Sequence, residues 1–219
     1  EKGKTTTYVY DKDNRLIEEK NASETLNYEY LPGGNRGERH GGGKRIKYTY
    51  NKADQLLKAG DETFRYDANG NLIESSGPDG TTRYDYDAED RLVRAIRPDG
   101  LSVRFGYAPT GERLWREDTK GRTSFVTDGT NLLAELDQDL KLKSAYLHGP
   151  GIDNPLIMLK DGQMRFYHSD RMGSVAVLTE GNAGTVSRYR TDAFGILHKE
   201  KETLTNPFIF TSREYEPAL

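Results

Sequence analysis

The sequence predicts an all-β protein, built from antiparallel β-hairpin repeats that form a curved, spiralling meander. Three observations lead to this fold class. A pair of aromatic residues two positions apart recurs along the first part of the chain, and a similar polar turn follows each pair. The composition is polar and rich in tyrosine, with 14 Tyr and 23 Gly among 219 residues, which favours strands joined by turns.

The repeat has a period of about 20 residues, and seven copies can be followed. They begin at Tyr8, Tyr28, Tyr48, Phe64, Tyr84, Phe105 and Phe125, with steps of 20, 20, 16, 20, 21 and 20 residues. The second aromatic places hold Tyr10, Tyr30, Tyr50, Tyr66, Tyr86 and Tyr107, whereas the degenerate seventh copy has Thr127. Because side chains alternate along a strand, both aromatics of a copy share one face, and the mixed residues between them fit a face turned to water. We expect the aromatic pairs to form a ladder in which each cross-strand contact contributes about 0.2–1 kcal/mol.

Each copy continues into a tight turn. Four positions after the second aromatic place stand residue types that tolerate a positive φ: Asn14, Gly34, Asp54, Gly70, Asp90, Gly111 and Asn131. These positions predict that every copy reverses in the same way into a second strand, which opens with an apolar pair such as Leu16-Ile17.

The second copy departs from the pattern. Residues 32–43 contain Gly33, Gly34, Gly37 and a run of three glycines, so we expect a mobile loop in place of the second strand. A glycine-rich phosphate cradle is the functional alternative. It is disfavoured because the chain lacks a GxxxxGK[ST] motif and no helical pattern follows.

After Leu133 the strict period fades while strand and turn signals continue. We therefore predict a repeat region of residues 1–136 and a second region of residues 137–219 that continues the same sheet. Residues 134–137 and 140–143 alternate as the arms of a hairpin around Gln138-Asp139.

Composition and charge exclude several classes of protein. A net charge of −3 and an isoelectric point near 5.9 predict no attraction to nucleic acid or to an anionic membrane. The absence of cysteine excludes a disulfide framework and thiolate metal sites. No apolar run approaches the roughly 20 residues that span a bilayer, and the first residues do not begin a signal peptide, so we expect a soluble piece of a longer protein.

The sequence favours a protein that is not an enzyme, and it predicts no catalytic residue, cofactor or metal. The four histidines are scattered, and no motif frames a nucleophile or zinc. His148 and His168 are interpreted as hydrogen-bonded structural residues in preference to metal ligands.

Two carboxylate groupings and the tyrosine ladder have functional alternatives. Asp11 begins a segment like a calcium loop, but the required glycine is missing and Ala22 stands in place of the bidentate glutamate. Asp85, Asp87 and Asp90 could form an acid pair that shares a proton. Their placement on alternate faces and a role in a turn explain them more simply. The tyrosines could stack sugar rings, although aromatic stripes at strand spacing more often form the core.

Several motifs resemble those of a known family. Tyr66–Leu72 resembles the YD repeat of bacterial RHS (rearrangement hotspot) proteins, which is also found in the C components of insecticidal toxin complexes and in teneurins. The segments at 146–151, 168–174, 192–195 and 210–215 resemble the RHS core-associated segment, taken in order. Arg171 and Met172, Ala193 and Ser212 depart from that pattern, in which His-Leu, Pro and Gly are usual.

The resemblance implies a partial or complete YD-repeat shell. Its implied function is a non-catalytic structural module of a bacterial polymorphic-toxin protein that encapsulates or carries a C-terminal toxin or cargo domain of the same polypeptide. It also implies a secreted or cell-surface location, with passage through a secretion apparatus as a variant. The alternatives are an extracellular carbohydrate-binding or adhesion module, with a glycan as partner, and a fragment of an aspartyl autoprotease shell. Open sheet edges further predict self-association.

Overall fold

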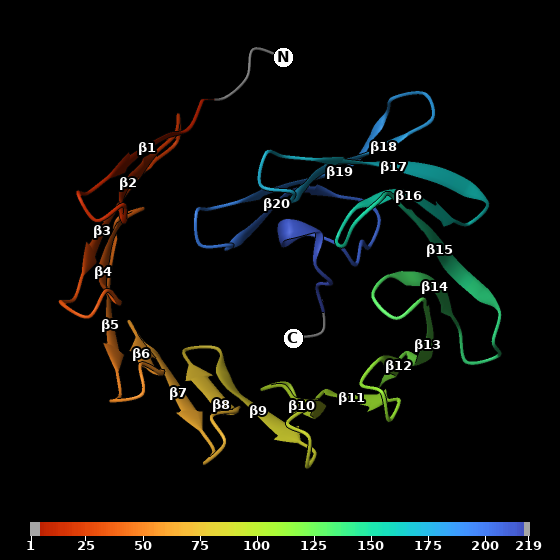
Figure 1. The fold of residues 1–219 in the computed structure, drawn as a ribbon, viewed down its shortest axis with the longest axis horizontal. Coiled ribbons are helices and arrows are strands. Elements are labelled where there is room, and N and C mark those ends of the chain that lie inside the picture. Colours follow the sequence, from red (N-terminus) through yellow and green to blue (C-terminus); the bar gives the residue numbers. More distant parts are fainter. Residues whose placement is uncertain (1–4, 217–219) are drawn as a thin grey trace. The chain divides into compact units, whose positions relative to one another are not determined.

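The computed structural model describes residues 5–216, and its strands belong to one antiparallel sheet (Figure 1). The predicted all-β class and the hairpin meander are confirmed. Contacts divide the chain into two compact units, one of residues 1–92 and 96–100 and the other of residues 93–95 and 101–219. This division follows contacts and not motifs, so the predicted boundary at residue 136 stays a prediction.

In the first unit, each strand pairs with the strand that follows it in the sequence. The strands are β1 (Thr7–Tyr10), β2 (Leu16–Lys20), β3 (Thr25–Tyr30), β4 (Arg36–Gly41), β5 (Lys44–Tyr50), β6 (Leu56–Ala59), β7 (Glu62–Tyr66), β8 (Leu72–Gly77) and β9 (Gly80–Tyr86). Strand β10 (Leu92–Ile96) lies at the boundary between the two units.

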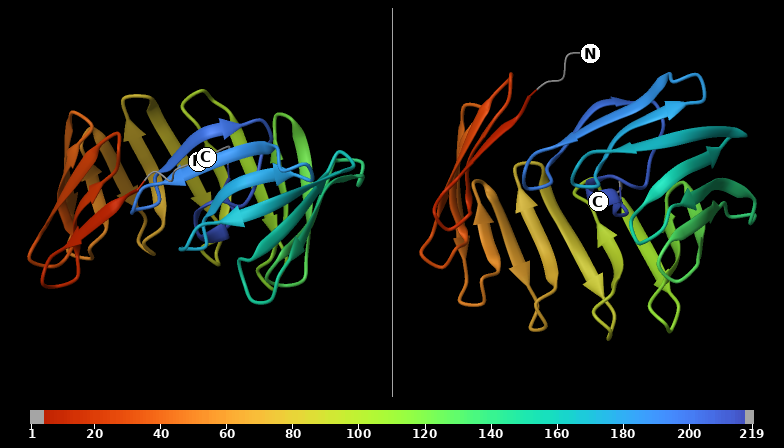
Figure 2. Two further views of the ribbon diagram at one scale, coloured as in Figure 1. Left: turned by 90° about the horizontal axis from the view of Figure 1, so that it is seen from above. Right: turned by 45° about the horizontal axis from the view of Figure 1, so that its top comes forward.

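The second unit repeats the same pairing rule, and tight turns join its strands (Figure 2). Its strands are β11 (Ser102–Tyr107), β12 (Arg113–Asp118), β13 (Gly121–Thr127), β14 (Leu132–Leu136), β15 (Leu142–His148), β16 (Pro155–Lys160), β17 (Gln163–Ser169), β18 (Val175–Glu180), β19 (Thr185–Thr191) and β20 (Leu197–Glu202). A short 3-10 helix, η1 (Phe210–Ser212), follows them. In the part of the chain that the structure describes, no helix has the length and apolar character needed to cross a membrane.

A register shift recurs at the second aromatic place. It falls between Val9 and Tyr10, between Glu29 and Tyr30, and at the equivalent point of later copies. In the first copy the Asn14 amide donates to the Asp11 carbonyl (3.1 Å), and Asn14 itself has a φ of +58°. A turn followed by a residue in the left-handed region produces this kind of bulge, which bends the strand and increases its twist.

The two faces of the strands differ as the alternation predicts. Tyr28 and Phe105 are buried, at 3% and 5% exposed, while the intervening Glu29 and Arg65 are exposed. Strand β1 is an exception, because it pairs with β2 alone in the described register and leaves Tyr8 and Tyr10 46% and 56% exposed.

The mobile loop predicted at residues 32–43 is wrong. Residues 36–41 form strand β4, which pairs with both β3 and β5. Gly37 and Gly41 fit this strand because side-chain and backbone atoms of nearby residues occupy the space beside them. A Cβ at Gly37 would lie 3.1 Å from Leu31, and one at Gly41 would lie 2.5 Å from the Thr25 carbonyl oxygen. Sheet pairing on both sides therefore outweighs the flexibility of the glycines.

An apolar core lies in the second unit, on the aromatic face of its sheet. It combines strand residues such as Tyr146, Met158 and Leu178 with Phe208 and Ile209 from the segment after β20. That segment, residues 206–216, is named the C-terminal segment below.

Candidate functional site

In most copies, the turn between the two strands is held by a side-chain oxygen of Asp or Asn that accepts hydrogen bonds from two backbone amides. In the turn after β7, Asp67 Oδ1 accepts from the backbone amides of Asn69 (2.9 Å) and Asn71 (2.8 Å). The Asn71 side chain also donates to Asp67 and holds the pKa of that carboxyl below its usual range. The same pair of backbone bonds is made by Asp11, Asn51 and Asp87 in the first unit and by Asp137, Asp170 and Asp192 in the second. This role is not among those predicted from the sequence, although an Asp or Asn directly after the second aromatic place is visible there.

The second tyrosine of a copy acts as a hydrogen-bond donor across the repeat. Its hydroxyl reaches back to the carbonyl that opens the second strand of the preceding copy. The pairs are Tyr30 to Leu16 (2.8 Å) and Tyr50 to Arg36, Tyr66 to Leu56 and Tyr86 to Leu72 (3.0 Å each). The pairing of β2 with β3 begins at Glu18, so the Leu16 carbonyl lies outside that ladder. The Tyr30 hydroxyl supplies a hydrogen-bond donor for this carbonyl. In the second unit, the ring Nε2 of His148 makes the equivalent contact with the Leu132 carbonyl (2.8 Å).

Removing one of these hydroxyls is expected to cost stability. Tyr66→Phe should lower the free energy of unfolding by about 0.5–1.5 kcal/mol, because the Leu56 carbonyl loses its donor. Chemical denaturation measures the change in the free energy of unfolding, and hydrogen exchange of the backbone amides of β6 to β8 shows where stability is lost. Tyr10→Phe is the control, since Tyr10 is 56% exposed. Equal effects of the two substitutions would contradict the role given to the Tyr66 hydroxyl.

The C-terminal segment lies on the aromatic face of the second unit. Figure 1 shows it in dark blue on the inner side of the curve that strands β11 to β20 follow. Its backbone is tied to the start of β18, because the Val175 amide donates to the Ile209 carbonyl (2.8 Å) and the Thr211 amide donates to Ser174 Oγ (2.9 Å). Ser212, which stands where the resembled family has glycine, has a φ of +55° and donates through Oγ to the Gly173 carbonyl (2.7 Å). That hydrogen bond compensates part of the strain of a left-handed serine.

Phe208 is the apolar anchor of the segment. Its ring is 3% exposed and makes edge-to-face contacts with Tyr146 (5.2 Å between centroids), His148 (5.5 Å) and Tyr167 (5.9 Å). Such aromatic pairs add about 0.5–1.5 kcal/mol each beyond the buried area. A single side chain thus joins the C-terminal segment to strands β15 and β17.

Polar contacts surround this anchor. Asn206 is 1% exposed and accepts a hydrogen bond from the Tyr167 hydroxyl (2.9 Å). Its side-chain amide also donates to the Phe208 carbonyl and accepts from the Phe208 backbone amide. The Tyr146 hydroxyl donates to Glu135 (3.2 Å) and the Tyr189 hydroxyl donates to Glu202 (3.2 Å). Burial raises the pKa of Tyr146 and of Tyr167 well above the usual tyrosine range, and raises the pKa of Tyr189 to about 12. These hydroxyls therefore remain protonated donors at pH values near 10, where an ordinary tyrosine begins to ionise.

The raised pKa values predict a loss of stability in alkali. An unfolded tyrosine ionises near pH 10, whereas the pKa of folded Tyr189 is about 12, so unfolding releases a proton above pH 10. The stabilising contribution is complete below pH 10 and is lost as the pH rises through about 12. Urea unfolding followed by circular dichroism at stepped pH measures this loss. Tyr189→Phe should make the loss shallower, and an identical pH dependence of the variant would contradict the prediction.

Ion pairs hold the end of the C-terminal segment. Arg113 pairs with Glu214, and Arg116 Nη1 lies 2.8 Å from Glu216 Oε1. Arg213 Nε lies 2.7 Å from Asp153 Oδ2. The carboxylate of Glu216 and the guanidinium of Arg116 are only 13% and 21% exposed, so water screens this pair less than an ordinary surface pair.

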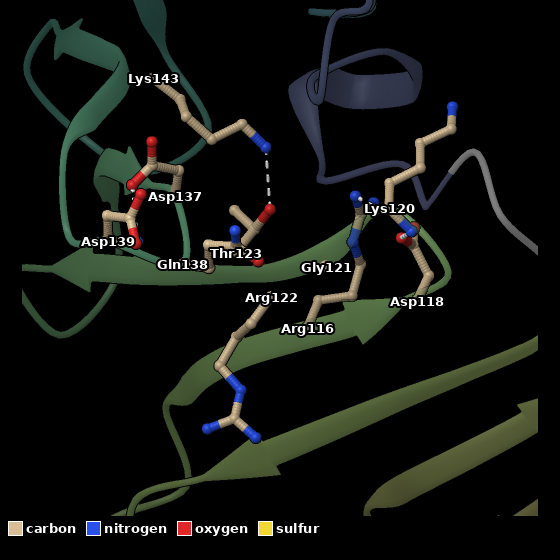
Figure 3. Close-up of a pocket in the computed structure, with 10 residues that line it drawn as sticks. All are labelled: Arg116, Asp118, Lys120, Gly121, Arg122, Thr123, Asp137, Gln138, Asp139 and Lys143. Atoms are coloured by element: carbon tan, nitrogen blue, oxygen red, sulfur yellow. Dashed lines mark hydrogen bonds and ion pairs between the residues drawn. The ribbon is translucent and has the colours of Figure 1, made fainter.

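Arg116 also lines a polar pocket at the rim of β12 to β15 (Figure 3). Lys143 Nζ donates to Thr123 Oγ1 across the pocket (2.9 Å), and Arg116 lies 3.6 Å from Asp118. Arg122 points away from the other basic groups in Figure 3 and stacks over Trp115, 4.2 Å from the ring centroid. The remaining wall carries Lys120, Gly121, Asp137, Gln138 and Asp139. Because charges of both signs alternate around it, the pocket does not favour a ligand of either charge.

The positions singled out in the sequence lie in the turns. Positive φ angles occur at Asn14 (+58°), Gly34 (+91°), Asp54 (+58°), Gly70 (+94°), Asp90 (+59°) and Gly111 (+101°). Asn131 differs, because the turn of that copy closes from Asp128 to Asn131 and is shorter. There the positive φ, +96°, belongs to Gly129.

The carboxylates considered for chemistry have structural partners. Asp11 is paired with Arg15 (2.7 Å), and its pKa is lowered mainly by the hydrogen bond from the Arg15 backbone amide, so its oxygens are not grouped for calcium. Asp87 closes a turn, and the hydrogen bond from the Arg91 side chain is the main cause that lowers its pKa, which is opposite to the effect of a shared proton. Asp90 accepts from the side chains of Asn69 (2.9 Å) and Asn71 (2.7 Å). His168 Nε2 lies 2.9 Å from Thr179 Oγ1, which fits the structural role predicted for it.

Comparison with known proteins agrees with the repeat geometry. The family model of the teneurin YD-shell matches residues 1–219. The chain is 29% identical over 217 residues to the tRNA3(Ser)-specific nuclease WapA of Bacillus spizizenii and 28% identical over 217 residues to the tRNA nuclease WapA of Bacillus subtilis. Each alignment covers 94% of this chain and only 9% of the relative's length.

Two solved structures are similar to the chain at low sequence identity. The crystal structure of TcdB2-TccC3 without its hypervariable C-terminal region is 14% identical, with a TM-score of 0.50, over 95% of this chain and 13% of that chain. The Tc holotoxin pore of Photorhabdus luminescens is 14% identical, with a TM-score of 0.46, over 97% and 16%. With a family model that matches from the first residue to the last, and with hairpins closed by the Tyr-Asp pair that characterises the repeat, the chain belongs to the teneurin YD-shell family.

Proposed function

We propose that the chain is a non-catalytic structural shell module that carries or encapsulates a C-terminal toxin or cargo domain of the same polypeptide. The observation that supports this most is the docking of the C-terminal segment on the aromatic face of the second unit, through Phe208, Asn206 and the Arg116–Glu216 pair. A polypeptide that continues beyond this segment would start from that face and not from the exposed one.

The relatives support a toxin context without placing catalysis in this stretch. Two of them are named as tRNA nucleases, and the chain spans 9% of their length. We assign the nuclease activity in those names to parts of the relatives outside the matched stretch. In this chain, Asp87 closes a turn and His148 contacts the carbonyl of a neighbouring strand, so both have structural roles.

A carbohydrate-binding function has less support. Sugar stacking needs exposed ring faces, but the hydroxyls of Tyr66 and Tyr86 are already donated to carbonyls and their side chains are half-buried. The autoprotease alternative is likewise weaker, since Asp192, in one of the core-associated motifs, is 4% exposed and caps a turn.

The proposal is tested in the full-length polypeptide by limited proteolysis. The C-terminal domain should resist a protease that readily cuts flexible linkers, and should lose this resistance in an Arg113→Gln, Arg116→Gln double variant that releases the C-terminal segment. Arg65→Gln, a substitution of a 67%-exposed side chain in the first unit, is the control. A full-length protein without a further C-terminal domain, or a domain cut equally fast in all three proteins, would refute the carrier function.

Self-association and a secreted or cell-surface location belong to the same proposal. The exposed strand β1, with Val9 46% exposed, offers an edge at which a second copy could pair. Sedimentation that gives a monomer at high concentration would refute pairing of this kind, and cell fractionation tests the location.

A further inference from the structure

Three side chains of the first unit converge on one point of the exposed face of β3 and β4. Glu29 and Glu38 stand directly opposite each other in the strand register, and His40 follows Glu38 on the same face. His40 Nε2 lies 3.2 Å from Glu29 Oε1 and 3.0 Å from Glu38 Oε2, and one ligand-type atom of each side chain lies within 4.8 Å of the other two. The sequence predicts no metal, because its histidines are scattered, and separately predicts a mobile loop around His40.

A cation stabilises this arrangement of two opposed carboxylates. Like charges directly opposite each other on neighbouring strands are destabilising, and Glu38 is only 16% exposed. The Nε2 atom of His40 is buried and forms no hydrogen bond of acceptable geometry with any described residue, although both carboxylates are near it. In the neutral tautomer with the proton on Nδ1, a nitrogen lone pair and two carboxylate oxygens therefore face a common point.

The two distances from His40 Nε2 to the carboxylate oxygens, 3.2 and 3.0 Å, match those between ligands of one metal ion. Zinc–nitrogen and zinc–oxygen bonds of about 2.0–2.2 Å place neighbouring ligand atoms about 3.0–3.5 Å apart, depending on the coordination geometry. Imidazole with carboxylates suits zinc and its neighbours among the transition metals, whereas calcium and magnesium prefer sites made of oxygen alone. We propose that Glu29, Glu38 and His40 bind a divalent transition-metal ion, of which Zn²⁺ is the representative, with water completing its coordination.

Two basic side chains from β5 now neutralise Glu38 and compete with the metal. Arg45 Nη2 lies 2.6 Å from Glu38 Oε2, the oxygen nearest His40, and Lys47 Nζ lies 3.4 Å from Glu38 Oε1. Arg45 and Lys47 are 58% and 67% exposed, so both can turn into water when a metal binds. The ion would then join β3 to β4 through side chains in addition to the backbone ladder.

The test is isothermal titration of the chelator-treated chain with ZnCl₂. Wild-type protein should bind one ion, and His40→Gln or Glu29→Gln should weaken binding by about tenfold or more. His198→Gln, a change to a histidine of β20 outside the triad, should leave binding unchanged. Arg45→Gln is the decisive variant, because removal of the competing guanidinium should tighten zinc binding severalfold.

Circular dichroism shows that each variant is folded before titration. Tighter binding in Arg45→Gln together with loss in His40→Gln would establish the site. No binding at millimolar zinc, equal binding in His40→Gln, or unchanged binding in Arg45→Gln would overturn it and leave the triad as an ion-pair network.

Discussion

Replacement of Phe208 by alanine is expected to lower the free energy of unfolding of the second unit by about 3–5 kcal/mol. The ring is 3% exposed and fills the space among Tyr146, His148 and Tyr167, so its removal leaves a cavity at the centre of the core. Because the same ring anchors the C-terminal segment, hydrogen exchange at residues 206–216 should rise together with the loss of stability.

Fluorescence of the single tryptophan makes this prediction measurable in the full chain. Trp115 lies on β12, so its denaturation curve reports on the second unit. Phe210→Ala is the matched control, since Phe210 belongs to the same segment but is 41% exposed, and it should cost much less. If both variants unfolded at the same denaturant concentration, the anchoring role of Phe208 would be refuted.

Gly41→Ala is expected to destabilise the first unit by about 2–4 kcal/mol. The new Cβ would lie 2.5 Å from the Thr25 carbonyl oxygen and 2.5 Å from Leu26, which is 1% exposed, and the glycine has a φ of +149°. Backbone and buried side chain must therefore both shift to make room.

Hydrogen exchange of the β3 to β5 amides measures this effect at the site. Gly33→Ala is the control, because a Cβ there meets nothing within 4 Å, and it should change stability by no more than about 0.5 kcal/mol. Exchange that is equally slow in the two variants would mean that residues 36–41 are not held as the strand described.

The repeat could be read from the sequence because its signals are local. A tyrosine pair at strand spacing, followed by Asn14, Asp54 or Gly70, encodes a strand, a turn and a second strand within one copy. The backbone bonds to Asp67 and its equivalents use groups only two and four residues away, so they too follow from the order of residue types. Strand β4 was missed for the opposite reason, since its glycines favour a loop by themselves and only pairing with β3 and β5 fixes them.

By itself, then, the amino-acid order determined the all-β class, the hairpin period and the difference between an aromatic and a polar face. Only the tertiary structure decided that Phe208 enters a core formed by β15 and β17, that Tyr30 donates to the carbonyl of Leu16, and that His40 meets two glutamates. The physical reason is distance along the chain. A turn is selected by the preferences of adjacent residues, whereas contacts between separate strands exist only after the whole sheet has set its register.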